Sequence, residues 1–210
     1  RLEAVPDMEY YPTSDPPRGE VILKGASLFS GYYKRDDLTK EALDADGWFH
    51  TGDVGEVQPN GSLKIIDRKK NIFKLSQGEY VAVEHVESVL KKNTLFDQIW
   101  VYGNSFENFL VAVVVPNEAQ VLAFAEENKL AGGYAELCAD DKVKKFVQDE
   151  LTKTGRAGKL KGFEIAKAVH LTAVPFSVED DLLTPTFKMK RPQFLKFFKA
   201  EVDAMYAAAK

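Results

Sequence analysis

Apolar and polar positions along the chain change their periodicity near residue 67. Before that point, short runs with strand character are bounded by turn residues, at 19–25, 52–58 and 62–67. The last two runs flank Pro59-Asn60-Gly61, which is typical of a β-hairpin turn. A short polar helix is predicted at 36–43, with Asp36 or Asp37 as its cap. This part of the chain is therefore predicted to be rich in β-structure.

Beyond residue 67, helical and strand periodicities alternate. Apolar residues recur every three or four positions in predicted helices at 81–92, 117–128, 142–151 and from Pro192 onward. Strands are predicted at 98–102, 109–115 and 167–174. Asn117 is placed to cap the second helix, and proline is tolerated in the first turn of the last one. The order predicts an α+β fold class, with a small α/β domain that follows the β-rich tail of a larger domain.

Composition narrows the class of protein. Of the 210 residues, 45% are hydrophobic and 29% charged, which is ordinary for a soluble domain, and a net charge of −4 gives no reason to expect a nucleic acid partner. The single cysteine, Cys138, excludes a disulfide framework and fits a reducing compartment. No apolar run approaches the ~20 residues that span a bilayer. The chain starts at Arg1 without an initiator methionine, so we expect a fragment of a longer protein.

Three short segments carry candidate chemistry. In Thr51-Gly52-Asp53 a carboxylate follows a glycine at the start of a strand, where it could bind the hydroxyls of a ribose. On these residues alone, a turn in which Asp53 bonds its own backbone is the simpler interpretation. The stretch 67–78, D-R-K-K-N-I-F-K-L-S-Q-G, is a solvated loop on charge alone, but Gly78 would let another molecule approach the backbone.

The third segment is the loop 184–192, T-P-T-F-K-M-K-R-P, which holds three cations in four residues. A lysine there could neutralise charge that develops on a phosphoryl group. The simpler interpretation is that these are solvated basic side chains on the surface ahead of a helix. The histidines His50, His85 and His170 lack metal-ligand spacing, so no metal site is predicted. A phosphate-binding loop of the G-x-x-x-x-G-K-[ST] type is also absent from the sequence.

The order and spacing of these segments resemble the C-terminal third of the long-chain acyl-CoA synthetases, in the adenylate-forming superfamily, most closely those of plants and green algae. The matching stretches are G-Y-Y-K-R-D-D-L-T-K-E-A-L (31–43), G-W-F-H-T-G-D (47–53), D-R-K-K-N-I-F-K-L-S-Q-G-E-Y-V (67–81), W-V-Y-G-N-S-F (100–106) and L-L-T-P-T-F-K-M-K-R-P (182–192). They extend over essentially the whole chain.

The resemblance implies a two-step ligase. A fatty acid and ATP form an acyl-adenylate and pyrophosphate, and the thiol of coenzyme A then displaces AMP. It also implies that residues 1–66 end the large AMP-binding domain, that 67–70 form a hinge, and that 71–210 are a small mobile domain that rotates between the steps. Charged side chains suit a hinge that is solvated in both orientations.

The resemblance assigns roles to individual residues. Asp53 and Arg68 match residues that bind the ribose of AMP, and Asp67 matches the hinge residue. Lys188 matches the lysine that acts in adenylation, and it is favoured over Lys190 by its offset from Pro185 and Thr186. Gly78 matches the loop along the path of the pantetheine arm. Many relatives carry glycine where this chain has Phe187.

Further expectations concern the parent protein. Its substrates would be fatty acid, ATP and coenzyme A, with Mg²⁺ held by ligands upstream in an N-terminal domain in cis, so that the fragment alone would be inactive. The parent would be intracellular and peripheral on the endoplasmic reticulum or another organelle membrane, since the ending Ala-Ala-Ala-Lys is not a peroxisomal signal. Two alternatives stay open: a coumarate- or acetate-type ligase, and a non-catalytic nucleotide- or acyl-binding relative.

Overall fold

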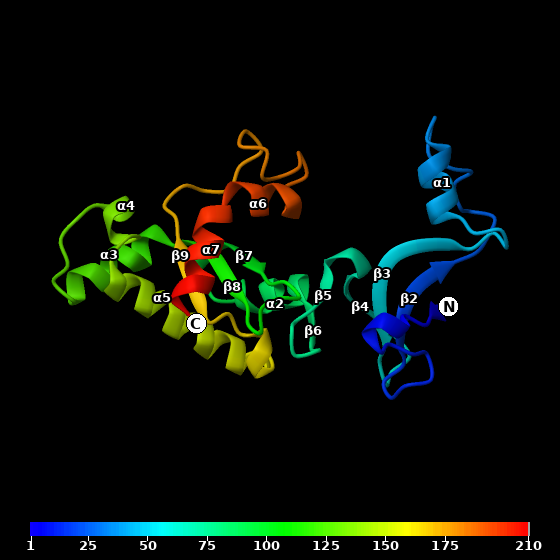
Figure 1. Cartoon of the computed structure of the whole chain (residues 1–210), viewed down its shortest axis with the longest axis horizontal. Helices are drawn as coiled ribbons and strands as arrows, with labels where there is room; N and C mark the ends of the chain where they lie inside the picture. Colours follow the sequence, from blue (N-terminus) through cyan, green and yellow to red (C-terminus); the bar gives the residue numbers. More distant parts are fainter. Residues whose placement is uncertain (210) are drawn as a thin grey trace. The chain divides into compact units, whose positions relative to one another are not determined.

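The computed structural model describes residues 1–209, except for the side chain of Asp67. The chain forms two compact units (Figure 1). The first unit comprises Arg1–Lys74 and Tyr80–His85, and the second comprises Leu75–Glu79 and Val86–Lys210. Helix and strand are mixed throughout, which confirms the predicted α+β class.

The first unit is built on an antiparallel sheet of four strands. In spatial order these are β1 (Leu2–Glu3), β2 (Arg18–Leu23), β3 (Phe49–Val57) and β4 (Leu63–Arg68). The predicted strand at 19–25 and the predicted hairpin across residues 59–61 are thus confirmed. The unit also holds the short pair β5 (Ile72–Lys74) and β6 (Tyr80–Ala82), the turns η1 (Pro6–Met8) and η2 (Lys69–Asn71), and helix α1 (Asp36–Ala42).

Two details of the first unit differ from the predictions. Arg35, not Asp36 or Asp37, is the N-cap of α1, and it makes no capping hydrogen bond through its side chain. Instead its guanidinium binds the Asp37 carboxylate. Asp36 and Asp37 lie within the first turn of the helix, where the helix dipole favours a negative charge even when the residue is not the cap. Strands β5 and β6 were not predicted, because each has three residues and no turn dipeptide of the usual kind between them.

The second unit contains a sheet in the order β7–β8–β9, formed by β7 (Phe96–Tyr102), β8 (Val111–Pro116) and β9 (Ala168–Leu171). β7 and β8 are antiparallel, whereas β8 and β9 are parallel. The helices are α3 (Glu118–Glu127), α4 (Tyr134–Leu137), α5 (Asp141–Ala157), α6 (Arg191–Phe197) and α7 (Lys199–Ala208), with the turn η3 (Gly162–Glu164). The last residues of α2 (Val83–Leu90), from Val86, also belong to this unit.

Strand β8 is the centre of this unit, since all six of its residues are buried. One face of the sheet, with Val111, Val113 and Val115, packs against the aromatic cluster of α6 and α7. Helix α5 contacts β9, and its own apolar stripe at Val143 and Val147 is fully buried. A strand covered on both faces reads as a continuous apolar run, as the sequence V-A-V-V-V here does.

The predicted helices of this unit exist, with two corrections. The helix predicted to start at residue 81 starts at Val83, because Val81 and Ala82 pair with β5 as part of β6. The predicted last helix is divided at Phe198, which ends α6 and precedes α7. Its ring is buried beside Phe194 and Trp100, so this break lets the aromatic residues of both helices enter one core.

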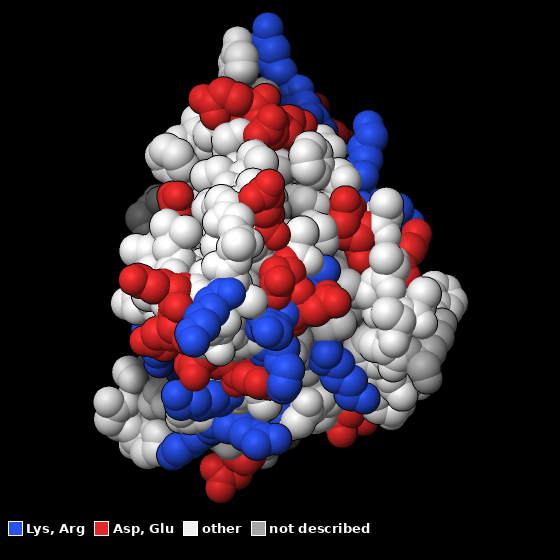
Figure 2. All heavy atoms as spheres, turned by 90° about the vertical axis from the view of Figure 1, so that its left-hand side faces the viewer, with Lys and Arg blue, Asp and Glu red and all other residues white. Residues whose placement is uncertain are grey.

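The face of the second unit that carries α3 and α4 shows acidic and basic side chains intermixed, without a broad area of one sign (Figure 2). On the face shown, charges of opposite sign lie close together and partly cancel each other's field. Among the described residues, no helix has both the length and the apolar character needed to cross a bilayer.

The aromatic core of α6 provides a matched test of this packing. Phe194 is 0% exposed and packs edge-on against Phe176, with ring centroids 4.8 Å apart, whereas Phe197 on the same helix is 58% exposed. Phe194→Ala should lower the unfolding free energy of the second unit by about 3–5 kcal/mol, because it leaves a cavity. Phe197→Ala should change it by less than about 0.5 kcal/mol.

Urea unfolding would measure both variants, with Trp100 fluorescence as the probe in a Trp48→Phe background so that only the second unit is reported. Equal losses for the two variants would contradict the core described above.

Candidate functional site

The motif Thr51-Gly52-Asp53 lies in a bulge of strand β3. Glu20 of β2 pairs with Val54 and Ile22 pairs with His50, so three residues of β3 lie opposite one of β2. The extra length requires a left-handed backbone at Gly52, whose φ is +70°, a conformation that glycine adopts without steric cost. A bulge of this kind interrupts the ladder and re-aims side chains.

The backbone of the bulge is held by two neighbours of Asp53. The Thr51 hydroxyl donates to the carbonyl of Val21 at 2.7 Å and accepts from the Asp53 N–H at 3.1 Å. The Gly52 N–H donates to the Glu20 carboxylate at 3.2 Å. Because Thr51 and Glu20 satisfy this backbone, the Asp53 carboxylate is not needed for the turn, contrary to the simpler interpretation of the motif.

Asp53 and Arg68 are direct cross-strand partners on β3 and β4. Arg68 Nε lies 3.5 Å from Asp53 Oδ1, and both side chains are partly open to solvent. An exposed ion pair of this length contributes little to stability, typically below about 1 kcal/mol. The structure thus brings together the two residues expected to bind ribose, in an arrangement that a ligand could enter at low cost.

Glu20 is a residue of this site that the sequence reasoning missed. It is buried, and besides the Gly52 N–H it accepts a hydrogen bond from Lys69 Nζ at 3.0 Å. Burial would raise the pKa of its carboxyl, but Lys69, the Gly52 N–H and His50 outweigh that effect and hold the pKa below its ordinary value. The available signal was a charged residue inside the apolar strand G-E-V-I-L, which needs a buried partner.

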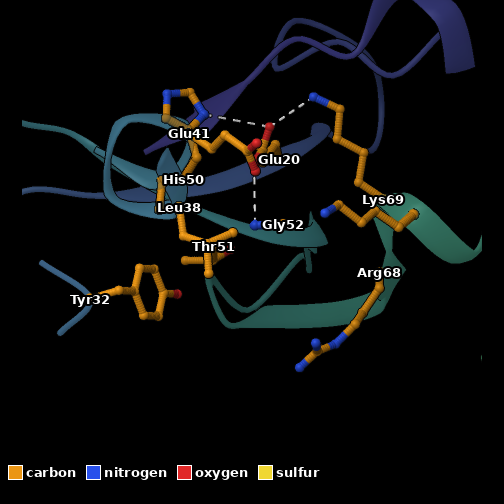
Figure 3. A pocket seen from close by; sticks show the side chains of 11 residues that line it. Glu20, Tyr32, Leu38, Glu41, His50, Thr51, Gly52, Arg68 and Lys69 are labelled. Atoms are coloured by element: carbon orange, nitrogen blue, oxygen red, sulfur yellow. Dashed lines mark hydrogen bonds and ion pairs between the residues drawn. The ribbon is translucent and has the colours of Figure 1, made fainter. Parts of the chain in front are cut away.

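A pocket of about 320 Å³ opens beside the bulge (Figure 3). Its wall is mostly polar and charged: Glu20, Tyr32, Leu38, Glu41, Ala42, His50, Thr51, Gly52, Arg68, Lys69 and Lys70. Arg68, Lys69 and Lys70 come from the end of β4 and the turn η2 that follows it. A pocket with hydrogen-bonding groups of both signs suits a polar, hydroxyl-bearing or anionic ligand better than an apolar one.

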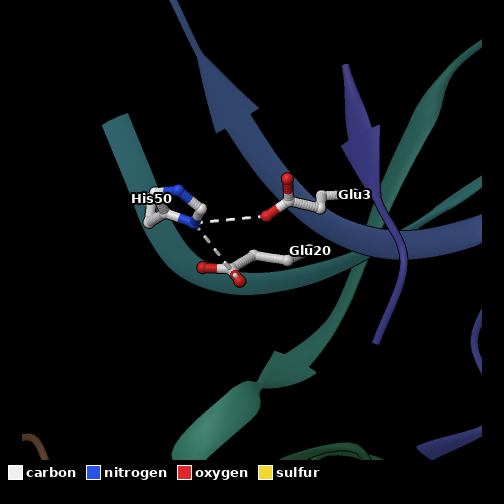
Figure 4. Close-up of side chains that lie close together, drawn as sticks. All are labelled: Glu3, Glu20 and His50. Atoms are coloured by element: carbon white, nitrogen blue, oxygen red, sulfur yellow. Dashed lines mark ion pairs between the residues drawn. The ribbon is translucent and has the colours of Figure 1, made fainter. Parts of the chain in front are cut away.

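Glu3, Glu20 and His50 form a cluster next to this pocket (Figure 4). His50 Nδ1 lies 3.5 Å from Glu3 and 3.6 Å from Glu20. The set does not fit Mg²⁺, which prefers an octahedron of oxygen ligands, because it contains a histidine and because Lys69 already supplies a positive charge to Glu20. No ion is assigned to it.

In the second unit, Lys188 follows the three-residue loop of a tight hairpin. Leu183 and Met189 form an antiparallel bridge, and the Thr184 N–H donates to the Lys188 carbonyl at 2.8 Å. Inside the hairpin, the Phe187 N–H donates to the Thr184 carbonyl at 2.8 Å, and the Lys188 N–H donates to the Thr184 hydroxyl at 3.0 Å. The segment expected to be an irregular loop is therefore an ordered turn.

The hairpin accounts for the expectation of a glycine at the position of Phe187. A three-residue loop of this type ends in a left-handed residue, and φ of Phe187 is +58°. A bulky side chain is rare in that region, and Phe187 is also 77% exposed. Phe187 thus adopts the turn geometry at the cost of local backbone strain.

The two candidate lysines differ in their partners. The Lys190 ammonium forms an ion pair with Asp181. Lys188 is exposed, and its ammonium makes no hydrogen bond or ion pair with any residue that the structure describes. This difference supports Lys188 as the cation available to a ligand.

The segment Leu75–Glu79 forms a second ordered turn. Gly78 has φ of +95°, and its N–H donates to the Leu75 carbonyl at 2.9 Å. The turn is fastened to the β7–β8 connection, because the Ser76 N–H donates to the Glu107 carbonyl and the Gln77 amide to that of Asn108. A pocket of about 340 Å³ lies beside it, lined by Ser76, Phe106, Glu107, Asn108, Phe109, Lys167 and Ala209.

The predicted hinge at 67–70 stays a prediction. The backbone of Asp67 belongs to β4 and pairs with Val54, but its side chain lies outside the described residues. Arg68 ends the strand, and Lys69 begins the turn η2.

The strain at Phe187 leads to a stability prediction. Phe187→Gly removes about 1–2 kcal/mol of left-handed strain and adds roughly 0.5–1 kcal/mol of backbone entropy cost. The unfolding free energy of the second unit should rise by up to about 1.5 kcal/mol, measured by Trp100 fluorescence in urea. Phe106→Gly is the control, since Phe106 is also highly exposed, at 88%, but has no positive φ, and it should lower stability. A loss in both variants would contradict the assigned strain.

Comparison with known proteins was made by sequence and by structure. No family model matches the chain. Long chain acyl-CoA synthetase 4 of Arabidopsis thaliana is 58% identical over 206 residues, which cover 98% of this chain and 31% of that protein. Long-chain-fatty-acid–CoA ligase 5 of Rattus norvegicus is 46% identical over the same share of this chain and 30% of its own.

The structural comparison agrees. The A domain of carboxylic acid reductase from Segniliparus rugosus, in complex with AMP and a co-purified carboxylic acid, superposes with a TM-score of 0.87 at 34% identity, over 100% of this chain and 31% of that one. The chain spans about a third of the length of the curated relatives it matches. Over that shared length, the chain belongs by sequence to the long-chain acyl-CoA synthetases and has the adenylate-forming fold.

Proposed function

We propose that the chain is the C-terminal part of an ATP-dependent long-chain fatty-acid–CoA ligase. The complete protein would convert fatty acid, ATP and coenzyme A into acyl-CoA, AMP and pyrophosphate. The observation that carries the proposal is the Lys188 ammonium, which has no partner among the described residues and lies on an ordered, exposed hairpin, in a chain 58% identical to a long-chain acyl-CoA synthetase.

In the first step, the fatty acid carboxylate attacks the α-phosphorus of ATP, and the bond to pyrophosphate breaks. Lys188 is proposed to stabilise the negative charge that builds on the α-phosphoryl oxygens. Asp53 would accept hydrogen bonds from the ribose hydroxyls, and Arg68 would stay beside it as a second ribose contact, because the two already face each other across β3 and β4. Mg²⁺ would be held by groups outside this chain, since the Glu3, Glu20 and His50 cluster does not fit it.

In the second step, the thiolate of coenzyme A attacks the acyl carbonyl, and AMP leaves with the electron pair of the broken anhydride bond. The pantetheine arm is proposed to pass the turn at Gly78, where a backbone without Cβ allows close approach. Lys188 would act at the active site in the first step, and the Gly78 turn would replace it there in the second. This replacement would require the proposed rotation of residues 71–210 about the hinge at 67–70. Hinges of this kind are a few residues that absorb a φ/ψ change.

The proposal also covers the setting of the parent protein. The parent is proposed to be intracellular and bound peripherally to an organelle membrane. Long-chain acids partition into bilayers, at about 0.8 kcal/mol per buried CH₂, which supports the membrane part of this proposal. AMP release by the full-length protein with palmitate, acetate and coumarate would test the acid class. Release with acetate or coumarate alone would favour the other ligase types, and no release with any acid would favour a non-catalytic relative.

The role of Lys188 is tested by separating the two half-reactions. In the full-length protein, Lys188→Ala should slow acid-dependent ATP–pyrophosphate exchange by about 10²–10³-fold, the usual cost of losing one electrostatic donor. Thioester formation from supplied acyl-adenylate should persist. Lys190→Ala is the control, because its ammonium is already paired with Asp181. Equal loss of both half-reactions in Lys188→Ala, or a loss of exchange only in Lys190→Ala, would refute the assignment.

The role of Asp53 is tested with nucleotide analogues. Hydrogen bonds to a charged group contribute roughly 1.5–3 kcal/mol, so Asp53→Ala should raise the KM for ATP by about 10- to 100-fold. The variant should also lose the preference for ATP over 2′-deoxy-ATP, which lacks one of the two hydroxyls. A preserved preference would exclude a ribose contact. Glu56→Ala, which removes a carboxylate from the same strand, should keep it.

A further inference from the structure

The second unit contains a buried carboxylate that the proposed reaction does not use. Glu87 of α2 is 3% exposed. Both of its oxygens bind the guanidinium of Arg191, at 3.0 and 2.7 Å, and Oε1 also accepts the Val101 N–H at 2.9 Å. Burial raises the pKa of the Glu87 carboxyl, while the bonds from Arg191 and Val101 act in the opposite direction.

These three residues come from different elements. Val101 lies in β7, which is an edge strand of its sheet, so its outward N–H needs an acceptor outside the ladder. Arg191 is the first residue of α6, directly after the hairpin that carries Lys188. The carboxylate therefore ties α2, the sheet edge and the end of that hairpin together.

The base of the hairpin has apolar and backbone anchors, since Leu182 and Leu183 are buried in the core of this unit and the Leu183 N–H donates to the Ser177 carbonyl at 2.9 Å. It is also held by the Leu183–Met189 bridge and by the Lys190 N–H, which donates to the Leu182 carbonyl at 2.9 Å. The ion pair of Lys190 with Asp181 is exposed on the Asp181 side, and such pairs add little rigidity. The bidentate Glu87–Arg191 contact differs, because a planar fork on a carboxylate restricts orientation as well as distance.

Stability alone does not account for such a pair. Replacing a buried ion pair by apolar residues of similar volume is often neutral or stabilising. What the apolar alternative lacks is a fixed geometry, and Lys188 lies only three residues before Arg191. A displacement of about 1 Å in a reacting group can reduce a rate by roughly 10²-fold.

We propose that Glu87 and Arg191 are positioning residues for Lys188, which hold the base of its hairpin on α2 and β7 so that the ammonium is delivered in one geometry. This inference rests on the role proposed for Lys188. Neither residue touches the substrates; each acts through the hairpin. Their loss should therefore affect the rate of adenylation more than the binding of ATP or fatty acid.

The test uses Arg191→Lys, which keeps the charge but removes the planar fork, and Glu87→Asp, which keeps the carboxylate but shortens its reach. In the full-length protein, each should lower kcat for acid-dependent ATP–pyrophosphate exchange by about 10- to 100-fold. KM for ATP and fatty acid should change less than about twofold, and thioester formation from supplied acyl-adenylate should be retained. The two substitutions change opposite partners of the same ion pair. If one variant does not fold, the other still tests the proposal.

A control separates positioning from loss of stability. Leu151→Ala removes a fully buried side chain of α5, away from the hairpin. It should lower the melting temperature and affect the rates of adenylation and thioester formation to the same extent. If Arg191→Lys and Glu87→Asp reduce both half-reactions equally, as Leu151→Ala does, the positioning role is wrong.

A second readout does not depend on activity. Hydrogen exchange of the 210-residue chain should be at least about tenfold faster in both variants at the hydrogen-bonded amides of Thr184, Lys188 and Lys190, and unchanged at Ala112 and Val114 of β8. Unchanged hairpin amides would overturn the inference. If instead Lys188→Ala left adenylation intact while the hairpin amides responded as expected, the proposed role of Lys188 would fail and the structural tie would stand.

Discussion

The demand that a buried backbone N–H find an acceptor shapes both units of this chain. In the first unit, the bulge of β3 takes Gly52 out of the ladder, and the Glu20 carboxylate accepts its N–H. In the second, the edge of β7 presents the Val101 N–H, and Glu87 accepts it. Glu20 and Glu87 are the two charged residues classed as buried among those described.

Each of these carboxylates needs a cation in turn, because an unpaired buried charge is costly. Glu20 binds Lys69, which immediately follows Arg68 of the proposed ribose site, and Glu87 binds Arg191, which begins α6 just after the Lys188 hairpin. A requirement of the backbone thus places a fixed cation next to each proposed functional segment. Asp53 and Lys188 themselves are left out of these buried pairs, which suits groups that act on a ligand.

Local backbone strain is also found next to Lys188. Phe187 occupies a left-handed position that glycine would adopt without steric strain, and Lys188 comes next. Strained residues persist where the surrounding structure over-determines them. Here the hairpin bridge on one side and the Arg191 contact on the other hold the turn in place.

Local patterns were sufficient for most elements of the fold. The strand at 19–25, the hairpin about Pro59-Asn60-Gly61 and the cap at Asn117 were predictable, because turn residues, apolar periodicity and capping act over a few neighbouring positions. The motif stretches also indicated the family. The predictions were wrong where a non-local partner decides: Val81 and Ala82 joined a strand because β5 lies beside them, and Phe198 broke the last helix to enter the core.

The same distinction applies to the candidate site. The sequence by itself determined which residue types are present, the order of the motifs, and that Asp53, Arg68, Gly78 and Lys188 were the residues to examine. Only the tertiary structure decided that Thr51 and Glu20 hold the bulge and that Glu87 meets Arg191, 104 positions away. It also decided that Lys190 pairs with Asp181, whereas the Lys188 ammonium has no partner among the residues described. These are contacts between elements distant in sequence, set by strand register and core packing, and no local pattern encodes them.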